Sequence, residues 1–262
     1  MMDKLNIEFP KKPDHCSQDE WEARVDLAAC YRLAHYYGWT STVYNHITLR
    51  VPNTDTFLIN AFGLNYNEIC ASNLVLIDID GNKLSDDSWT INKAGYLIHS
   101  AIHRARDNDL HCVMHSHEVN TQTLAASNQK VIPLIQEGCQ LFERVGYHDF
   151  EGIVLNPDEQ NRLIQSLGKE NHTLLLRNHG LITAGPSAAW AFIRHQVFIR
   201  NTEVQLKLMA SNATINRIPD NVLRHTRQQF EGGDAQGGAK VRHPEWPAFW
   251  RLLDEIDPSW KS

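Results

Sequence analysis

Apolar and polar positions along the chain alternate in segments that predict both helices and short strands. Ser17-x-x-Glu20 is a capping box, and the apolar spacing after it predicts a helix that ends at Gly38. Further helices are expected at 94–106, 119–127, 157–168 and 186–210. Strands are expected at 43–51, 56–60, 74–78, 110–115, 151–155, 173–177 and 181–184. An apolar stripe at helical spacing closes the chain, formed by Trp246, Phe249, Trp250, Leu253 and Ile256.

The order of these segments predicts one α/β domain. Strands and helices alternate without a strict βαβ rhythm, and compact turns such as Asp80-Gly81 favour an antiparallel or mixed sheet with helices on its faces. We therefore divide the chain into an N-terminal arm (1–16), a domain (17–214) and a C-terminal helical tail (215–262). The glycine-rich stretch 232–238 is typical of a flexible linker, and the tail is expected to pack on the domain or on a neighbouring subunit.

Composition narrows the class of protein. The chain has 262 residues, 42% of them hydrophobic, enough for one large domain or two small ones. A net charge of −6 with mixed signs argues against a nucleic-acid partner. The sequence has no signal peptide and no apolar window long enough for a membrane span. Five scattered cysteines without a Cys-x-x-Cys pair favour reduced thiols in a cytoplasmic protein.

Candidate chemistry begins at His115-Ser116-His117, where an apolar strand ends. Residues two apart on a strand point to the same face, so both imidazoles could bind one metal ion. Two surface histidines are the alternative. His179 is the best candidate for a third ligand, because it interrupts a second apolar strand and Gly180 beside it allows positive φ. Three protein ligands leave positions open for water or substrate, as in catalytic metal sites.

Other histidines compete for this role. His99 and His103 lie four apart on a predicted helix and share a face, but Ser100 stands where a zinc-protease motif has its glutamate. We expect both to face the sheet or a subunit contact rather than a metal. Five other histidines are interpreted as structural or surface residues: His35, His46, His148, His172 and His195.

A series of motifs in one order carries a family resemblance over about residues 20–210. They are Tyr44-Asn45-His46-Ile47-Thr48-Leu49-Arg50, Ile59-Asn60-Ala61-Phe62-Gly63-Leu64, 74–81, 92–103, His115-Ser116-His117, 147–152 and Leu174-Leu175-Leu176-Arg177-Asn178-His179-Gly180-Leu181. Together they resemble the class II aldolase/adducin family, and most closely its adducin-like branch. The chain shows no lysine-rich tail of the kind expected of cytoskeletal adducins, which favours a stand-alone domain of the bacterial type.

The resemblance implies a three-layer α/β/α fold around a mostly antiparallel sheet of about nine strands. It implies a homotetramer with the site at a subunit interface, and a divalent metal ion held by His115, His117 and His179. Zn²⁺ is expected, with Mn²⁺, Co²⁺ or Fe²⁺ as alternatives. Such an ion stabilises an enediolate formed from a small oxygenated carbonyl or sugar-phosphate-like substrate. The anionic tail of that substrate is expected at Asn45 and Gly63, with Asn60 nearby; ordinary turn chemistry is the alternative for these positions.

The sequence departs from the aldolases at two catalytic positions. Lys93 lies nearest the place of the family's glutamate acid/base, and Glu137 stands roughly where the family has a tyrosine. Lys93 is a catalytic base only if its pKa is lowered, and a surface lysine is the alternative. Glu137 could supply a replacement carboxylate. Two functions therefore remain: a metal-dependent lyase-like enzyme of aldolase, decarboxylase or dehydratase type, or an adducin-like binding module that retains the metal site without catalysis.

Overall fold

The computed structural model describes residues 9–152, 157–235 and 243–262. Its helices are α1 (Gln18–Tyr36), α2 (Lys93–Ala105), α3 (Val119–Ala125), α4 (Pro157–Leu167), α5 (Ala188–Ala210), α6 (Asp220–Ala235) and α7 (Trp246–Ile256). Its strands are β1 (His46–Arg50), β2 (Thr56–Ile59), β3 (Val75–Asp78), β4 (Cys112–Ser116), β5 (Val145–His148), β6 (Thr173–Leu176) and β7 (Gly180–Gly185). Short 3₁₀ helices are η2 (Tyr66–Glu68), η3 (Ala71–Asn73), η4 (Glu137–Leu141) and η6 (Pro258–Lys261). No helix among the described residues has the length and apolar character that a bilayer crossing requires.

The strands form one mixed sheet in the order β3-β2-β1-β4-β7-β6-β5. The prediction of about nine strands was wrong, since the described residues form seven. Every neighbouring pair is antiparallel except β5 and β6, which are parallel. The parallel pair follows from connectivity, because α4 joins these two strands as a crossover and so returns the chain in the same direction.

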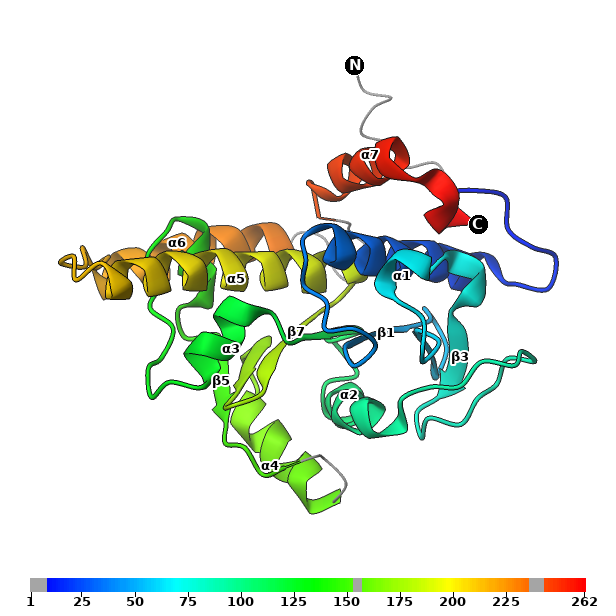
Figure 1. Cartoon of the computed structure of the whole chain (residues 1–262), viewed down its shortest axis with the longest axis horizontal. Helices are drawn as coiled ribbons and strands as arrows, with labels where there is room; N and C mark the ends of the chain where they lie inside the picture. Colours follow the sequence, from blue (N-terminus) through cyan, green and yellow to red (C-terminus); the bar gives the residue numbers. More distant parts are fainter. Residues whose placement is uncertain (1–8, 153–156, 236–242) are drawn as a thin grey trace.

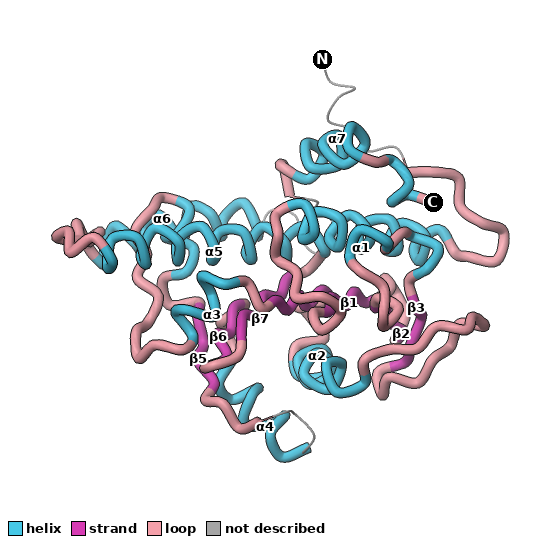
Figure 2. Tube along the Cα trace, in the orientation of Figure 1, coloured by secondary structure: helices cyan, strands magenta, loops and turns pink. Residues whose placement is uncertain are grey.

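Helices cover both faces of the sheet, which gives the expected α/β/α layering (Figure 1). The helices α1 and α5 lie on one face, α2 and α4 on the other, and α7 lies outside α1 (Figure 2). Side chains of β4 alternate accordingly. Cys112 and Met114 join the core under α1 and α5, whereas Val113 joins the core under α2 and α4. The histidines that follow Val113 at two-residue intervals therefore belong to the α2 side.

The start of the chain follows its local signals. Ser17 caps α1 by accepting a hydrogen bond from the amide of Glu20 at 3.1 Å, and Gly38 takes φ +73° just beyond the helix end. Both boundaries of α1 were therefore predictable from the capping residues alone.

Two strand assignments in the second half differ from the sequence prediction. Strand β5 was not predicted, because it is short and Gly146 interrupts its apolar pattern; a Cβ there would lie 2.2 Å from the Ser166 carbonyl oxygen, so α4 can pack closely only against glycine. The predicted strand at 151–155 is not observed at Glu151 and Gly152, and its other residues lie outside the described residues.

The C-terminal segment packs on the domain. Trp246 is fully buried, and its indole N–H donates to Asp26 of α1 at 2.9 Å. Helix α6 was not predicted, and residues 232–235, which we assigned to a linker, form its last turn; 236–238 lie outside the described residues. Residues 243–262 thus add a layer outside α1, so this helix is buried on both sides.

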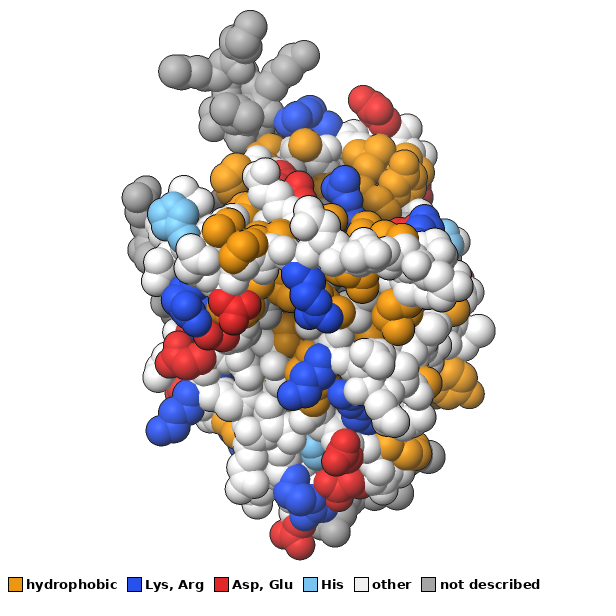
Figure 3. All heavy atoms as spheres, turned by 90° about the vertical axis from the view of Figure 1, so that its left-hand side faces the viewer, with side chains coloured by type: hydrophobic (Ala, Val, Ile, Leu, Met, Phe, Trp, Pro, Cys, Tyr) orange, Lys and Arg blue, Asp and Glu red, His pale blue; other side chains and the backbone are white. Residues whose placement is uncertain are grey.

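Charged side chains are mixed on the surface. On the face shown in Figure 3, acidic and basic side chains are interspersed rather than gathered in a basic stripe. This distribution agrees with the mixed signs of the charged residues in the sequence.

Candidate metal centre

Three histidines from two neighbouring strands of the sheet converge. His115 and His117 lie at the end of β4, and His179 lies in the turn that leads into β7, the antiparallel neighbour of β4. One nitrogen from each ring lies within 4.8 Å of the other two. Nε2 of His115 and Nε2 of His117 are 2.9 Å apart, and the ring centroids are separated by 4.7 to 4.9 Å. The structure thus brings together the three residues that the sequence analysis selected.

The ring of His115 is oriented by the main chain. Its Nδ1 lies 3.0 Å from the carbonyl oxygen of Leu181, so Nδ1 carries the proton and donates it. This hydrogen bond leaves Nε2 with a lone pair directed toward His117 and His179. A fixed tautomer of this kind is common among metal-binding histidines.

Burial keeps the three rings neutral. It lowers the pKa of His115 well below its ordinary value, with His179 adding to the effect. Burial, followed by the proximity of His117, lowers the pKa of His179 to about 4, and burial also lowers the pKa of His117. Neutral imidazole is the form that binds metal, so the group is prepared for a cation near neutral pH.

The turn that presents His179 has a different glycine requirement from the one we predicted. Positive φ falls on Asn178, at 56°, and not on Gly180. Gly180 is needed for space instead, since a Cβ there would lie 2.4 Å from the Ser116 carbonyl oxygen and 3.1 Å from Cδ2 of His117. Asn178 tolerates the left-handed conformation because its short polar side chain is compatible with it.

The donor set fits a tetrahedral divalent ion. Zinc–nitrogen bonds of about 2.0–2.1 Å place tetrahedral ligand atoms roughly 3.3 Å apart. The three nitrogens already lie within 4.8 Å, with one pair at 2.9 Å, so small ring rotations reach that geometry. Glu118, the next residue, is used elsewhere: its carboxylate caps α3 by accepting from the amide of Thr121 at 2.9 Å.

The predicted substrate-binding residues differ in their surroundings. Asn45 is buried, its Nδ2 donates to the Trp39 carbonyl oxygen at 3.1 Å, and its Oδ1 has no hydrogen-bond partner among the described residues. Asn60 accepts from the hydroxyl of Tyr31 at 3.0 Å and so belongs to a structural network. Gly63 is exposed with φ +99°. Of these, Asn45 alone offers an unsatisfied buried atom, and that atom is a hydrogen-bond acceptor.

The two predicted catalytic residues lie apart. Lys93 is exposed at the first position of α2. Glu137 lies in η4 and lines a different pocket, together with Trp190, Arg200 and His243 on the α5 side. None of the three converging histidines lines that pocket.

Sequence reasoning missed His46, which we had interpreted as structural or surface. It pairs with His115 in the β1–β4 register, and their ring centroids are 5.1 Å apart. Gly95 of α2 makes room for it, since a Cβ at this position would lie 2.3 Å from Nε2 of His46. The signal was present in His46 and Thr48, polar residues two apart on an otherwise apolar strand.

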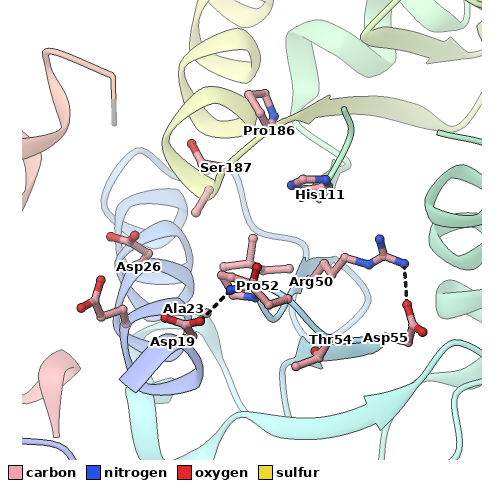
Figure 4. A pocket seen from close by; sticks show the side chains of 14 residues that line it. Asp19, Ala23, Asp26, Arg50, Pro52, Thr54, Asp55, His111, Pro186 and Ser187 are labelled. Atoms are coloured by element: carbon pink, nitrogen blue, oxygen red, sulfur yellow. Dashed lines mark hydrogen bonds and ion pairs between the residues drawn. The ribbon is translucent and has the colours of Figure 1, made fainter. Parts of the chain in front are cut away.

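A sizeable cavity lies away from the three histidines. It measures about 670 Å³ and is bordered by the first turns of α1, the turn after β1, and the start of α5 (Figure 4). Asp19 and Asp26 of α1 line it on one side and His111 lies opposite, whereas the guanidinium of Arg50 points away to the carboxylate of Asp55 at 3.2 Å. None of the three converging histidines lines it, so its size alone does not identify the chemical site.

Comparisons with known proteins identify the family of this chain. Residues 25–206 match the family model described as "Class II Aldolase and Adducin N-terminal domain". The chain belongs to the class II aldolase and adducin family. A Pseudomonas aeruginosa protein whose name places it in aldolase class 2 is 40% identical over 245 residues, which cover 94% of each chain.

Two further relatives of this class II aldolase and adducin family member differ in the proteins they are named for. An adducin-related protein of Schizosaccharomyces pombe is 37% identical, covering 94% of this chain and 78% of that protein. The structure of L-fuculose 1-phosphate aldolase from Glaciozyma antarctica aligns with a TM-score of 0.81 at 22% identity, over 99% of this chain and 98% of that one. The second likeness establishes the shared fold. The family therefore includes proteins named for aldolase chemistry and proteins named for adducin.

Proposed function

We propose that this chain is a metal-dependent lyase-like enzyme that acts on a small oxygenated carbonyl or sugar-phosphate-like compound. The convergence of His115, His117 and His179 carries the proposal, because three neutral imidazoles with one oriented lone pair form a binding site for a divalent cation, most suitably Zn²⁺. When bound, such an ion supplies a Lewis acid that polarises a carbonyl oxygen of the substrate. Kinship with a fold relative named for L-fuculose 1-phosphate supports testing ketose phosphates first.

The chain's own residues would bind and orient the substrate. Oδ1 of Asn45 is buried without a partner in the described part of the chain. It suits a substrate hydroxyl rather than a phosphate oxygen, because a carbonyl oxygen can only accept a hydrogen bond. At the exposed turn, the amides of Phe62 and Leu64 already donate to carbonyl oxygens, so the amide of Gly63 is the one that would donate to an anion. The anionic tail is therefore expected at the turn, and Asn45 is expected to contact the hydroxylated part.

Proton transfer would come from Lys93 or Glu137. Lys93 is the first residue of α2, and the first turn of this helix contacts His46. His46 lies beside the histidine group, by which we mean His115, His117 and His179. Glu137 lines another pocket of its own chain, so a role for it requires the copy from a neighbouring subunit. The proposal therefore includes a homo-oligomer, for which we expect a tetramer by light scattering, with the small-molecule site at the subunit interface.

A non-catalytic, adducin-like binding module is the second candidate. It is favoured by the exposed lysine at the position where the aldolases have a glutamate, and by the 37% identity to an adducin-related protein. In this case the metal site would remain and turnover would be absent.

Metal analysis tests the site. Protein purified without added metal should contain about one divalent ion per chain, or gain one on addition of zinc or manganese. His115→Ala and His179→Ala should lose it, whereas His225→Ala, at an exposed histidine of α6, should retain it. A wild-type protein that stays metal-free after both additions would exclude the site.

A substrate panel tests catalysis. Ketose phosphates, hydroxy acids and β-keto acids should include at least one compound that is turned over, and turnover should disappear with a chelator and return with the metal. Metal binding without turnover across the panel would favour the binding module.

A further inference from the structure

A continuous series of buried polar side chains runs between α2 and β1 and ends beside the histidine group. His103 Nδ1 lies 3.2 Å from the Leu110 carbonyl oxygen, and His103 Nε2 lies 2.8 Å from the hydroxyl of Thr48. The same hydroxyl lies 2.8 Å from His99 Nδ1, and His99 Nε2 lies 2.9 Å from His46 Nδ1. The four residues that form the series are each at most 3% exposed, so bulk water does not compete for these hydrogen bonds. They are His103, Thr48, His99 and His46.

The carbonyl group at one end fixes the position of every proton in the series. A carbonyl oxygen only accepts, so Nδ1 of His103 carries the proton and Nε2 accepts from the hydroxyl of Thr48. With its proton committed, the hydroxyl oxygen accepts from Nδ1 of His99. Burial lowers the pKa of His103 to about 3 and that of His99 well below its ordinary value, so both rings are neutral and each carries one proton.

The last member of the series is His46. Nε2 of His99 has no proton, so Nδ1 of His46 donates to it. In a neutral ring this leaves Nε2 of His46 as an acceptor, and this atom forms no hydrogen bond with the residues that the structure describes. The ring lies 5.1 Å from that of His115, at the first turn of α2 where Gly95 leaves space for it.

We propose that His46 is a substrate-contacting residue whose Nε2 accepts a hydrogen bond from a substrate hydroxyl group beside the histidine group, and that Thr48, His99 and His103 are positioning residues that fix its tautomer. The proposal rests on the proposed function for the location of the substrate. The proton positions do not depend on the proposed function, because they follow from hydrogen bonds within the chain itself. It explains why β1 carries the buried polar residues His46 and Thr48, although burying a polar group is unfavourable unless it is hydrogen-bonded.

The proton positions can be measured in the metal-free protein, independently of any activity. Nitrogen-15 NMR of histidine-labelled protein distinguishes the two neutral tautomers, with assignment by single histidine substitutions. We expect the Nδ1–H form at His46, His99 and His103. An Nε2–H form at His46 in the wild type would overturn the proposal, whether or not the protein binds zinc.

Thr48→Val tests the relay, with Thr48→Ser as the matched control. Valine has the shape of threonine without the hydroxyl, so His99 loses its acceptor and is free to move its proton to Nε2, which would displace the proton of His46. We expect the Nε2–H form of His46 to appear in Thr48→Val and to be absent in Thr48→Ser. An unchanged tautomer in Thr48→Val would refute the positioning role. If Thr48→Val does not fold, the wild-type spectrum still decides the assignment.

A pair of probes tests the hydroxyl contact. Acetohydroxamate and glycolohydroxamate both chelate zinc, and only the second carries a hydroxyl group beyond the chelating atoms. By calorimetry with zinc-loaded protein, glycolohydroxamate should bind about 3- to 10-fold more tightly, as expected for one hydrogen bond. His46→Phe should abolish this difference while retaining zinc. Equal affinities in the wild type would overturn the contact, and a protein that takes up no zinc would instead refute the proposed function while leaving the tautomer result intact.

Discussion

Gly180→Ala should damage the proposed metal centre without replacing any of its three histidines. The added Cβ would lie 2.4 Å from the Ser116 carbonyl oxygen, 3.1 Å from His117 Cδ2 and 3.3 Å from His115 Cε1. Real Cβ atoms do not approach a carbonyl oxygen so closely, so the β4–β7 pair must separate locally or the imidazoles must rotate. Gly180 has no positive φ, so the effect comes from space rather than from backbone strain.

The magnitude follows from overpacking and from ligand misplacement. Forcing one methyl group into a packed site costs about 1–3 kcal/mol of the free energy of unfolding. This is less than the roughly 5–15 kcal/mol that holds a typical domain folded, so the variant should still fold. Disturbing groups that orient metal ligands typically weakens metal affinity about 10- to 100-fold, and we expect a zinc affinity reduced within this range.

Urea unfolding of the metal-free protein and zinc titration against a chromophoric chelator measure the two effects separately. Gly232→Ala is the matched control, because a Cβ at this glycine of α6 meets no atom within 4 Å. It should leave zinc affinity unchanged and should not destabilise the protein. Wild-type stability together with wild-type zinc affinity in Gly180→Ala would refute the reasoning.

Three further predictions follow from buried groups. Burial lowers the pKa values of His103 and His195 to about 3, so both stabilise the fold above pH 6.5 and lose that contribution as pH falls toward 3. At pH 5 each should lower the free energy of unfolding by about 2 kcal/mol, as measured by urea unfolding. His195→Gln should reduce the slope of the free energy of unfolding against pH by the equivalent of about one proton. Trp246→Ala should lower the free energy of unfolding by about 3–5 kcal/mol, and an equal loss in Trp246→Phe would contradict a packing origin. Tyr31→Phe removes a hydroxyl that accepts from the amides of Ile47 at 2.9 Å and Asn60 at 3.1 Å, and should cost about 1–3 kcal/mol in the same assay; no loss would mean that water replaces the hydroxyl.

The convergence of the histidines was predictable because its cause is mostly local. Two-residue spacing on a strand places His115 and His117 on one face, and the break in a second apolar run singles out His179. The start and end of α1 were likewise predictable, since Ser17 and Gly38 act within a few residues of themselves.

Features that depend on distant pairing were not predictable. His46 meets His115 through the β1–β4 register and meets His99 through the docking of α2, and neither is encoded in local spacing. Strand β5 was hidden by Gly146, whose reason is the close approach of α4. Glu137 was selected from its position in the order of the family motifs along the chain. That order does not specify the side of the sheet on which a side chain lies.

The segments that bear the three proposed ligands belong to β4 and β7, adjacent strands in the middle of the sheet. An ion bound across this pair would act as a cross-link between two segments more than 60 residues apart in the sequence. Cation occupancy would then slow the amide hydrogen exchange of β4 and β7 more than that of the sheet edges β3 and β5. The opening and closing needed for substrate entry and product release would therefore fall to the surface turns, such as that around Gly63, while the histidine group stays fixed to the least mobile part of the sheet.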